Sequence, residues 1–388
     1  MMQSPFKDKV LIIDGHARQS IALAKGFNEL GCFVTAVCES KLDLCACSRY
    51  VHKNIIDKSS KENPKRKVEL ALREVKRVEY TLVVACTDYT AEHLSLRKDE
   101  FEEYTKTSVV DKDKFYLAFD KLKTMQICME NDLPCPKTYL NCSSADDVLS
   151  KGPEYPVIVK PQSGYGAIGF HKFDDEAALR KYLEDHKEDI PHLVIQEYIP
   201  QTSLQYECAM FIDDNNEVKS AMVFEKNRWF PVHGGSSTLN TSVRDAQISS
   251  DCSKLLQLIN WRGPADIDLI RDPRDGKAKI MEINPRMSGS TKIVFLSGVN
   301  MAKQLLQRAK GEEVTAYPYY LSGVRLRCLY TDLLWFIKSK DRFKAKPSWF
   351  NFARTHEQIF SLKDPKPFFG FTITSMLKLK KELKKRGE

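Results

Sequence analysis

The chain has 388 residues, and 42% of them are hydrophobic, which suffices for two or three domains with substantial cores. Its 60 Lys and Arg against 52 Asp and Glu give a net charge of +8, a modest excess that suits anionic substrates. The basic residues do not alternate with aromatic residues, so we expect no nucleic-acid partner. No apolar run reaches the ~18 residues of a membrane span, so we expect no stable membrane insertion.

The chain contains eleven cysteines, an odd number, with no Cys-x-x-Cys motif. Most lie in apolar runs, where cysteine acts as a small hydrophobic residue. With no signal peptide evident, this usage favours a reducing compartment, and we predict a cytoplasmic protein.

Residues 1–110 alternate between strand and helix patterns. Apolar runs predict strands at Val10–Ile13, Phe33–Val37 and Leu82–Ala85, and helical periodicity predicts helices at Ser20–Leu30 and Pro64–Val78. This alternation is typical of a doubly wound α/β domain.

Two turns of this region carry candidate substrate residues. The first turn, Asp14-Gly-His-Ala-Arg, is not Gly-x-Gly-x-x-Gly, which argues against a dinucleotide. Ligands gather at the C-terminal ends of parallel strands, so we expect Arg18, Thr87 and Asp88 to contact an acceptor substrate. His16 is more readily explained as a structural or solvated turn residue.

A helix is predicted after Phe119 and ends near Asn131, before Pro134. Lys121 lies in its first turn, where on its own it would be read as a solvated lysine. Lys112 and Lys114 lie nearby in a similar Asp-Lys context and are the alternatives to Lys121.

A glycine-rich loop follows the apolar strand Val157–Val159, which delivers Lys160 to it. The loop contains Ser163, Gly164, Gly166 and Gly169, and a second strand, Phe170–Phe173, follows. Glycines let backbone N–H groups approach phosphate oxygens closely, and the lysine adds a positive charge. Because the lysine precedes the glycines, this is not the Gly-x-x-x-x-Gly-Lys-Ser/Thr loop. An ordinary hairpin turn is the alternative.

The segment Leu193–Pro200 reads as a short buried strand that ends in Glu197, Tyr198 and Ile199. The backbone of such a segment can pair with an adenine edge while apolar side chains cover the ring. A plain core strand is the alternative.

Further along, a loop with two glycines and hydroxyl groups begins at Trp229. Its residues and a neighbouring arginine suit a carboxylate or amine substrate, and an ordinary exposed loop is the alternative. The candidates are Arg228, His233, Gly235 and Ser236.

Residues 263–290 concentrate oxygen-bearing side chains on one predicted hairpin. Glu282 and Asn284 are two apart in an apolar run and therefore share one face of a strand. A hairpin turn at Asp272–Gly276 would place Asp268 beside Glu282, with Arg286 just beyond. Hard oxygen ligands that leave room for phosphates suit Mg²⁺. A salt-bridged surface hairpin is the alternative.

After Gly311 the pattern changes, and residues 332–352 are rich in aromatic side chains. Residues 375–388 are predicted to form a basic amphipathic helix. Weak peripheral contact with anionic lipid is one interpretation. A solvated terminal helix is the interpretation that we favour.

Taken in order, the Asp-Lys helix, the Val-Lys-Pro strand with its glycine loop, the Gln-Glu-Tyr-Ile-Pro segment and the Glu-Ile-Asn-Pro-Arg strand resemble the ATP-grasp superfamily. The resemblance is closest to its carbamoyl-phosphate-synthase-like and carboxylate–amine ligase branches, and covers residues 111–311. It implies two α+β subdomains that hold ATP between them. We therefore expect a doubly wound α/β domain (1–110), ATP-grasp subdomains A (111–195) and B (196–311), and a C-terminal extension (312–388).

The resemblance also implies residue roles. The nucleotide would be bound by Lys121, Lys160, the loop residues Ser163, Gly164, Gly166 and Gly169, the hinge residues Glu197, Tyr198 and Ile199, and Glu207 at the ribose, with Gln205 competing for that role. Mg²⁺ or Mn²⁺ would be bound by Asp268, Glu282 and Asn284. Asp268 stands where family members often carry Gln or Glu. Arg286 and Lys160 would act on the transferred phosphoryl group.

The implied reaction is ATP-dependent activation of a carboxylate as an acyl phosphate and its joining to an amine, with ADP and phosphate released. The substrates would be a small-molecule carboxylate and an amine, and a homodimer is compatible with the sequence. One alternative is a biotin-carboxylase-like or carbamoyl-phosphate-forming enzyme that uses bicarbonate. A non-catalytic nucleotide-binding module is the other.

Overall fold

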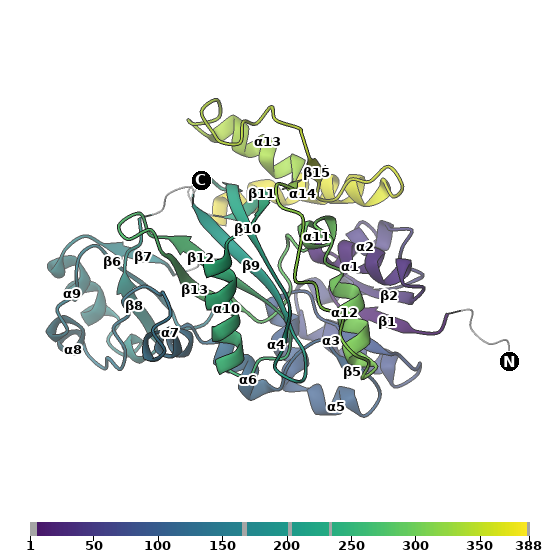
Figure 1. Ribbon diagram of the computed structural model, residues 1–388, viewed down its shortest axis with the longest axis horizontal. Coiled ribbons are helices and arrows are strands. Elements are labelled where there is room, and N and C mark those ends of the chain that lie inside the picture. The colour runs from purple at the N-terminus through teal and green to yellow at the C-terminus, as the bar shows by residue number, and fades with distance from the viewer. Residues whose placement is uncertain (1–5, 165–168, 201–203, 233–234, 386–388) are drawn as a thin grey trace.

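The computed structural model describes residues 6–164, 169–200, 204–232 and 235–385, with side chains described up to residue 377 (Figure 1). Within these residues the chain forms three sheets, of three, seven and five strands. In Figure 1 they follow one another along the longest axis, with the seven-stranded sheet in the middle and two C-terminal helices above it.

The N-terminal region is a parallel sheet in the order β3-β2-β1-β4-β5. Its strands are β1 (Lys9–Ile12), β2 (Phe33–Cys38), β3 (Lys53–Ile56), β4 (Leu82–Val84) and β5 (Lys106–Thr107). Its helices are α1 (Arg18–Glu29), α2 (Leu44–Cys47), η1 (Lys58–Lys61, 3-10), α3 (Lys65–Val75), α4 (Asp88–Leu96) and α5 (Lys98–Glu102). The hydrophobic patterns of the sequence do not predict β3, which is largely exposed, or β5, which is two residues long.

Alternation along β1 explains why helices cover both faces of this sheet. Val10 and Ile12 pack in one buried cluster with Leu23 of α1, whereas Leu11 packs in another with Val68 of α3. Successive side chains of a strand point to opposite faces, so the two helices lie on opposite sides. The predicted doubly wound α/β architecture is confirmed.

Two helices, α6 (Lys112–Phe119) and α7 (Lys121–Glu130), lead to the three-stranded sheet. Its order is β7-β6-β8, with both pairings antiparallel. The strands are β6 (Val157–Pro161), β7 (His171–Phe173) and β8 (Leu193–Glu197), and the helices beside them are α8 (Ala145–Ser150), α9 (Glu176–Asp185) and the 3-10 turn η2 (Ile190–His192). β8 spans the predicted boundary between residues 195 and 196, and the predicted boundaries stay predictions.

The seven-stranded sheet has the order β13-β12-β9-β10-β11-β14-β15. The strands are β9 (Gln205–Ile212), β10 (Val218–Phe230), β11 (Ser236–Val243), β12 (Gly263–Arg271), β13 (Ala278–Asn284), β14 (Arg325–Arg327) and β15 (Thr355–Glu357). The helices of this part are α10 (Ala246–Leu258), α11 (Lys292–Leu296) and α12 (Met301–Ala309). The extension therefore adds two strands to this sheet, which its sequence does not reveal because each has three residues.

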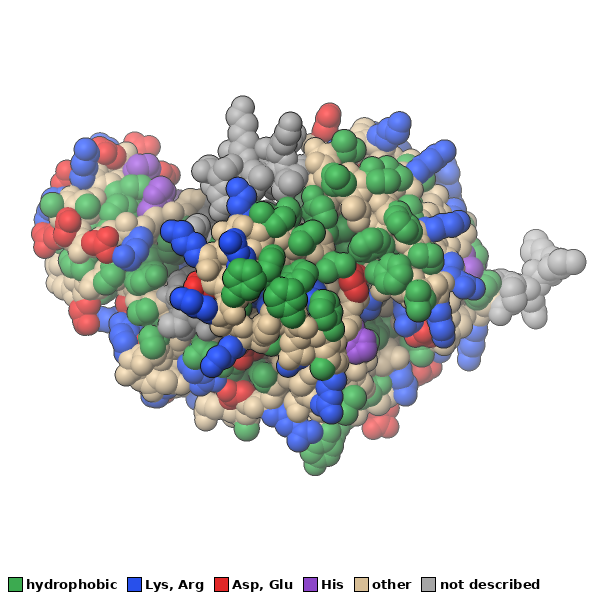
Figure 2. Space-filling view, turned by 90° about the horizontal axis from the view of Figure 1, so that it is seen from above, with side chains coloured by type: hydrophobic (Ala, Val, Ile, Leu, Met, Phe, Trp, Pro, Cys, Tyr) green, Lys and Arg blue, Asp and Glu red, His purple; other side chains and the backbone are tan. Residues whose placement is uncertain are grey.

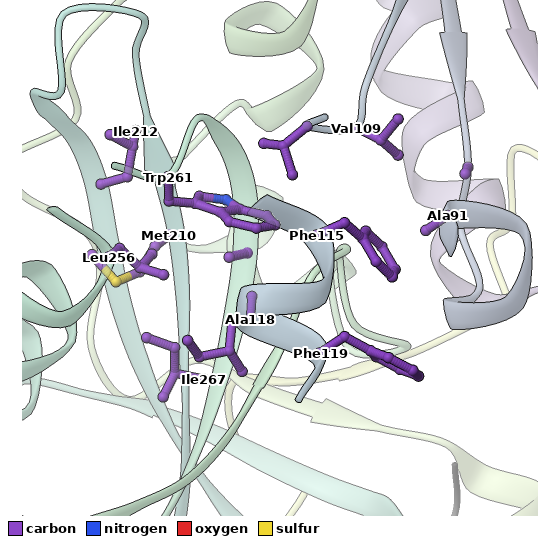
Figure 3. Packing of buried hydrophobic residues seen from close by; sticks show 14 of the residues in the cluster. Ala91, Val109, Phe115, Ala118, Phe119, Met210, Ile212, Leu256, Trp261 and Ile267 are labelled. Carbon is purple, nitrogen blue, oxygen red and sulfur yellow. The ribbon is translucent and has the colours of Figure 1, made fainter. Parts of the chain in front are cut away.

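One buried cluster joins the N-terminal region to the seven-stranded sheet. Figure 3 shows Phe115 and Ala118 of α6 between Trp261, Met210 and Ile267 on one side and the N-terminal region on the other. Phe115 and Met210 are fully buried, and burying such side chains contributes about 1.5–3 kcal/mol each. This packing fixes the N-terminal region against the middle sheet.

The chain ends in α13 (Leu329–Lys338) and α14 (Lys366–Lys385). The predicted terminal helix is present but begins nine residues earlier than the sequence pattern indicates. Among the described helices, none is long and apolar enough to cross a membrane. All eleven cysteines are free thiols.

Candidate functional site

A cavity of about 880 Å³ lies where the three-stranded sheet, the seven-stranded sheet and the N-terminal region meet. Most of the residues that the sequence singles out line it. They are Arg18, Asp88, Lys121, Lys160, Ser163, Gly164, Gly169, Tyr198, Ile199, Glu207, Gly235, Ser236, Asp268, Glu282, Asn284 and Arg286. Gly166 and His233 lie outside the described residues.

The β12–β13 hairpin supplies one wall of this cavity. Asp268 pairs with Glu282 in the strand register and Asp266 pairs with Asn284, which confirms the predicted placement of Asp268 beside Glu282. The Asn284 side-chain amide donates to Asp268 Oδ2 at 3.3 Å. The predicted oxygen-bearing side chains therefore lie together.

Two lysines face these oxygens from the other side of the cavity. Lys121 begins α7, where the Asp120 carboxylate caps the helix, and its Nζ lies 3.3 Å from Glu282 Oε2. Lys160 is the second-last residue of β6, and burial lowers its pKa to about 8. The charge of Glu282 opposes this shift and that of Lys121 adds to it. An anion bound between the lysines would raise that pKa again, because a nearby opposite charge favours the charged form.

The two described ends of the glycine loop, Gly164 and Gly169, line the cavity beside these lysines. Gly164 accepts a hydrogen bond from Lys121 Nζ through its carbonyl at 3.3 Å. Gly169 has a φ of 78°, and a Cβ there would meet the Pro161 ring at 2.9 Å. This close approach of loop and strand requires glycine at position 169.

Lys226 on β10 is a cavity residue that the sequence reasoning missed. Its Nζ contacts Asp268 Oδ1 and lies 3.2 Å from Glu207 Oε2. Burial alone would lower the pKa of Lys226, but the Asp268 and Glu207 carboxylates outweigh it and raise the pKa above its usual range. The sequence feature that could have indicated this residue is a lysine within the long strand-forming run of residues 218–230.

Arg286 joins the hairpin to the N-terminal region. Its Nε lies 2.8 Å from one Asp88 oxygen and its terminal nitrogen donates to the other at 2.9 Å. Burial opposes its charge, but Asp88 raises the pKa of Arg286. A bidentate pair of this kind is geometrically specific and brings two predicted residues, 198 positions apart, into one contact.

Asp266, also missed by the sequence reasoning, lies behind this pair. It is 2% exposed and accepts a hydrogen bond from the Ser288 N–H at 2.6 Å. Burial, and then the charge of Glu207, raise the pKa of Asp266 well above its usual range. Its carboxyl group is thus held among like charges, which favours the protonated form.

Arg18 and Thr87, the other two candidate residues of the N-terminal region, differ in whether they line the cavity. Arg18 lines the cavity and donates to Gln358 Oε1 at 3.0 Å. Thr87 does not line it: its hydroxyl caps α4 and contacts Asp14 Oδ2 at 3.2 Å. The predicted substrate contact at Thr87 is corrected to a helix-capping role, which a Thr directly before a helix start could have signalled.

Arg228 requires the same kind of correction. Lys226 and Trp229 line the cavity whereas Arg228 between them does not, because the register of β10 shifts on both sides of Arg228 and interrupts the regular alternation of side chains. Arg228 is 2% exposed and its guanidinium donates to both Asp332 oxygens, at 2.8 and 3.0 Å. It therefore anchors α13 to the sheet instead of facing a substrate.

The Glu197 carboxylate accepts hydrogen bonds from three residues outside the cavity. It accepts from the Lys137 N–H at 2.9 Å and from Lys279 and Arg274 at 3.2 and 2.7 Å. Burial opposes its charge, but these partners lower the pKa of Glu197. Its neighbours Tyr198 and Ile199 line the cavity, so a contribution of this segment to a ligand falls to backbone and apolar groups.

Comparison with known proteins agrees with this geometry. Residues 118–290 match the ATP-grasp domain family. The chain is 25% identical over 245 residues to D-aspartate ligase of Enterococcus faecium (strain Aus0004), covering 57% of each protein. It is 24% identical over 235 residues to the carbamoyl phosphate synthase arginine-specific large chain of Bacillus subtilis (strain 168), covering 56% of this chain and 21% of that protein. The chain thus spans less than two thirds of these relatives.

Solved structures show the same fold. Biotin carboxylase from Campylobacter jejuni, in complex with β-γ-ATP, aligns with a TM-score of 0.69 at 16% identity and covers 82% of this chain and 74% of that one. N5-carboxyaminoimidazole synthetase from Staphylococcus aureus aligns with a TM-score of 0.61 at 14% identity, covering 80% and 79%. Residues 118–290 therefore form an ATP-grasp domain, as the four motifs predicted.

Proposed function

We propose that this protein is an ATP-dependent ligase that activates a carboxylate as an acyl phosphate and joins it to an amine. The observation that carries the proposal is the charge pattern of the cavity: Lys121 and Lys160 face Glu282, Asp268 and Asn284 on the hairpin. Cations opposite oxygen ligands are the arrangement that a metal-bound polyphosphate needs.

At the phosphate end, Lys121 and Lys160 would bind phosphate oxygens and the glycine loop would cover them. The oxygen donors of Asp268, Glu282 and Asn284 fit Mg²⁺ or Mn²⁺, which would neutralise phosphate charge when bound. Among the described residues no three His, Cys, Asp or Glu side chains form a complete metal site, so phosphates and water would supply further ligands. Lys226 would have to share Asp268 with the metal.

At the other end, Arg286 would face the phosphoryl group in transfer, and Asp88 holds its guanidinium in place. The carboxylate oxygen attacks the γ-phosphorus and ADP leaves. The amine nitrogen then attacks the carbonyl carbon, loses a proton and releases phosphate. Two anions must meet in the first step, so these side chains act by positioning and charge neutralisation.

The acceptor would lie between the phosphate end and the N-terminal region. Arg18 lines that part of the cavity, as do Gly235, which precedes β11, and Ser236, which begins it. The similarity to D-aspartate ligase supports an amino acid as one substrate. The cytoplasmic location and the homodimer stay predictions.

The test is an ADP-release screen with Mg²⁺ and pairs of carboxylates and amines, with D-aspartate included in both roles. The proposal expects ADP release that requires both members of a pair. ADP release that requires bicarbonate would favour the bicarbonate-activating alternative. ATP binding without ADP release across the whole panel would favour the non-catalytic alternative.

A further inference from the structure

The last 60 residues differ in charge from the rest of the chain. Residues 329–388 contain fourteen Lys and Arg against six Asp and Glu, a net charge of +8 that equals the net charge of the whole protein. Residues 1–328 are therefore neutral overall. The positive field of the molecule originates in its C-terminal segment.

α13 carries an apolar stripe on its outward side. Leu329, Leu333 and Ile337 recur every four residues and are 38%, 45% and 58% exposed. The other side of the helix buries Asp332 and Trp335 against the seven-stranded sheet. A helix on a soluble domain normally buries its apolar stripe, whereas here the apolar stripe faces outward and a buried ion pair anchors the helix.

α14 repeats this arrangement. Phe369, Ile373, Met376 and Leu377 are spaced as one helix face, and all four are between 48% and 77% exposed. The opposite side packs Phe371 onto the cluster around Leu44 and Ile21. Both helices are therefore held to the body by one side and present apolar side chains on the other.

The segment between these helices adds exposed aromatic residues. Phe343, Phe350 and Phe352 are 58–73% exposed, and the Phe343 and Phe350 rings contact Phe336 of α13 at 5.5 and 5.8 Å. Figure 2 shows hydrophobic side chains gathered on this side of the molecule with Lys and Arg around them. We name this surface the C-terminal face; it comprises Leu329, Leu333, Ile337, Phe343, Phe350, Phe352, Leu362, Phe369, Ile373, Met376 and Leu377.

Lysines are interspersed with these aromatic residues. Lys338, Lys340, Lys344 and Lys346 are all exposed. None of them forms an ion pair with any side chain described in the structure. The C-terminal face therefore has two properties: its apolar side chains are exposed, and the four lysines among them have no carboxylate partner among the described side chains.

We propose that the C-terminal face docks on the surface of an anionic phospholipid bilayer. Apolar and aromatic side chains would enter the headgroup boundary while the lysines contact lipid phosphates, and two such signals together are what stable peripheral binding requires. A second copy of this chain is a poorer occupant, because its face would bring the same excess of positive charge into contact with this one.

The experiment is flotation of the full chain with vesicles of 70% zwitterionic and 30% anionic phospholipid, and with vesicles of zwitterionic lipid alone. The test variant is Ile337→Ser/Phe343→Ser/Leu377→Ser. The matched control is Tyr104→Ser/Met129→Ser/Leu258→Ser, whose side chains are 41–46% exposed elsewhere on the surface. Circular dichroism and ATP binding verify that each variant is folded.

We expect the wild type and the control to float with anionic vesicles only, and to be released largely by 0.5 M salt, which reduces the Debye length to a few ångströms (~3 Å at 1 M). The test variant should lose about fivefold or more of the bound fraction. Equal flotation of the test variant and the wild type would overturn the proposal, as would no flotation of the wild type at low salt. A dimer in sedimentation that the test variant abolishes, with no lipid binding, would assign the face to a second copy instead.

Discussion

The central cavity and the C-terminal face both concentrate basic side chains, but they hold them differently. In the cavity, Lys226 contacts Glu207 and Asp268, and Arg286 forms a bidentate pair with Asp88. On the C-terminal face, Lys338, Lys340, Lys344 and Lys346 are exposed and pair with no described carboxylate. Matched buried charges position groups for chemistry, whereas unmatched exposed charges attract an extended anionic surface.

Removing one cavity carboxylate should give the largest effect. Glu282→Gln keeps the shape of the side chain but removes the charge that faces Lys121, and we expect ADP release to fall by at least about 10³-fold. Thermal unfolding should show an intact fold. Glu154→Gln, at an exposed surface pair, is the control, and turnover in Glu282→Gln equal to that of the control would refute the metal-ligand assignment.

The next largest effect concerns the link between the two regions. Asp332 is fully buried and pairs with Arg228 and Arg327, so Asp332→Ala leaves two buried guanidinium groups without their carboxylate. We expect the free energy of unfolding to fall by about 3–5 kcal/mol. Urea denaturation measures it, with the exposed Asp341→Ala as control. A loss no larger than that of the control would mean that the C-terminal segment is not anchored through this pair.

A cavity lysine should matter for binding more than for folding. Lys160→Met removes a charge from the phosphate end, and we expect ATP affinity to fall roughly ten- to a hundredfold, because hydrogen bonds to charged groups contribute about 1.5–3 kcal/mol. Calorimetry measures the affinity, with Lys181→Met on α9 as control. Unchanged affinity would exclude Lys160 from the nucleotide site.

The lowered pKa of Lys160 predicts a pH dependence of ATP binding. In the free protein this ammonium loses its proton near pH 8, below the ordinary lysine value, and an anion would raise the pKa. Affinity should therefore be greatest below pH 8 and fall above it, by at most about tenfold per pH unit. The Lys160→Arg variant, which stays charged, should flatten the profile between pH 7 and 9. A wild-type profile as flat as that of the variant would contradict the assignment.

The smallest effect should come from the C-terminal face in the absence of lipid. Leu377→Ala removes an exposed side chain and should change the free energy of unfolding by less than about 0.5 kcal/mol. The fully buried Leu305→Ala should cost about 2–5 kcal/mol in the same assay. A large cost at Leu377 would show that the face is part of the core packing and not a free surface.

Local patterns in the sequence predict much of the fold and part of the candidate site. The turn signal at 272–276 and the strand pattern of residues 279–284 bring Asp268 close to Glu282, because strand period and turn position largely fix the register of a hairpin. Their direct pairing also depends on a register shift of one residue between Asp268 and Leu269, which the sequence pattern does not reveal. The doubly wound N-terminal sheet follows from alternating strand and helix patterns in the same way.

What the sequence could not predict depends on contacts between distant residues. Arg228 binds Asp332, 104 positions away, and nothing near Arg228 in the sequence shows that its charge is already matched. Lys226 needs β9, β10 and β12 to be adjacent before its two carboxylate partners come together. β14 and β15 are too short to carry a recognisable period and owe their place to pairing.

The most direct test of the central claim is to trap the acyl phosphate. The protein is incubated with ATP, Mg²⁺, hydroxylamine and each carboxylate of the substrate panel, and hydroxamate and ADP are measured together. We predict that one carboxylate gives hydroxamate in equal amount to ADP, and that Glu282→Gln gives neither. ADP formed with every carboxylate of the panel omitted, or without any hydroxamate, would contradict carboxylate activation in this cavity.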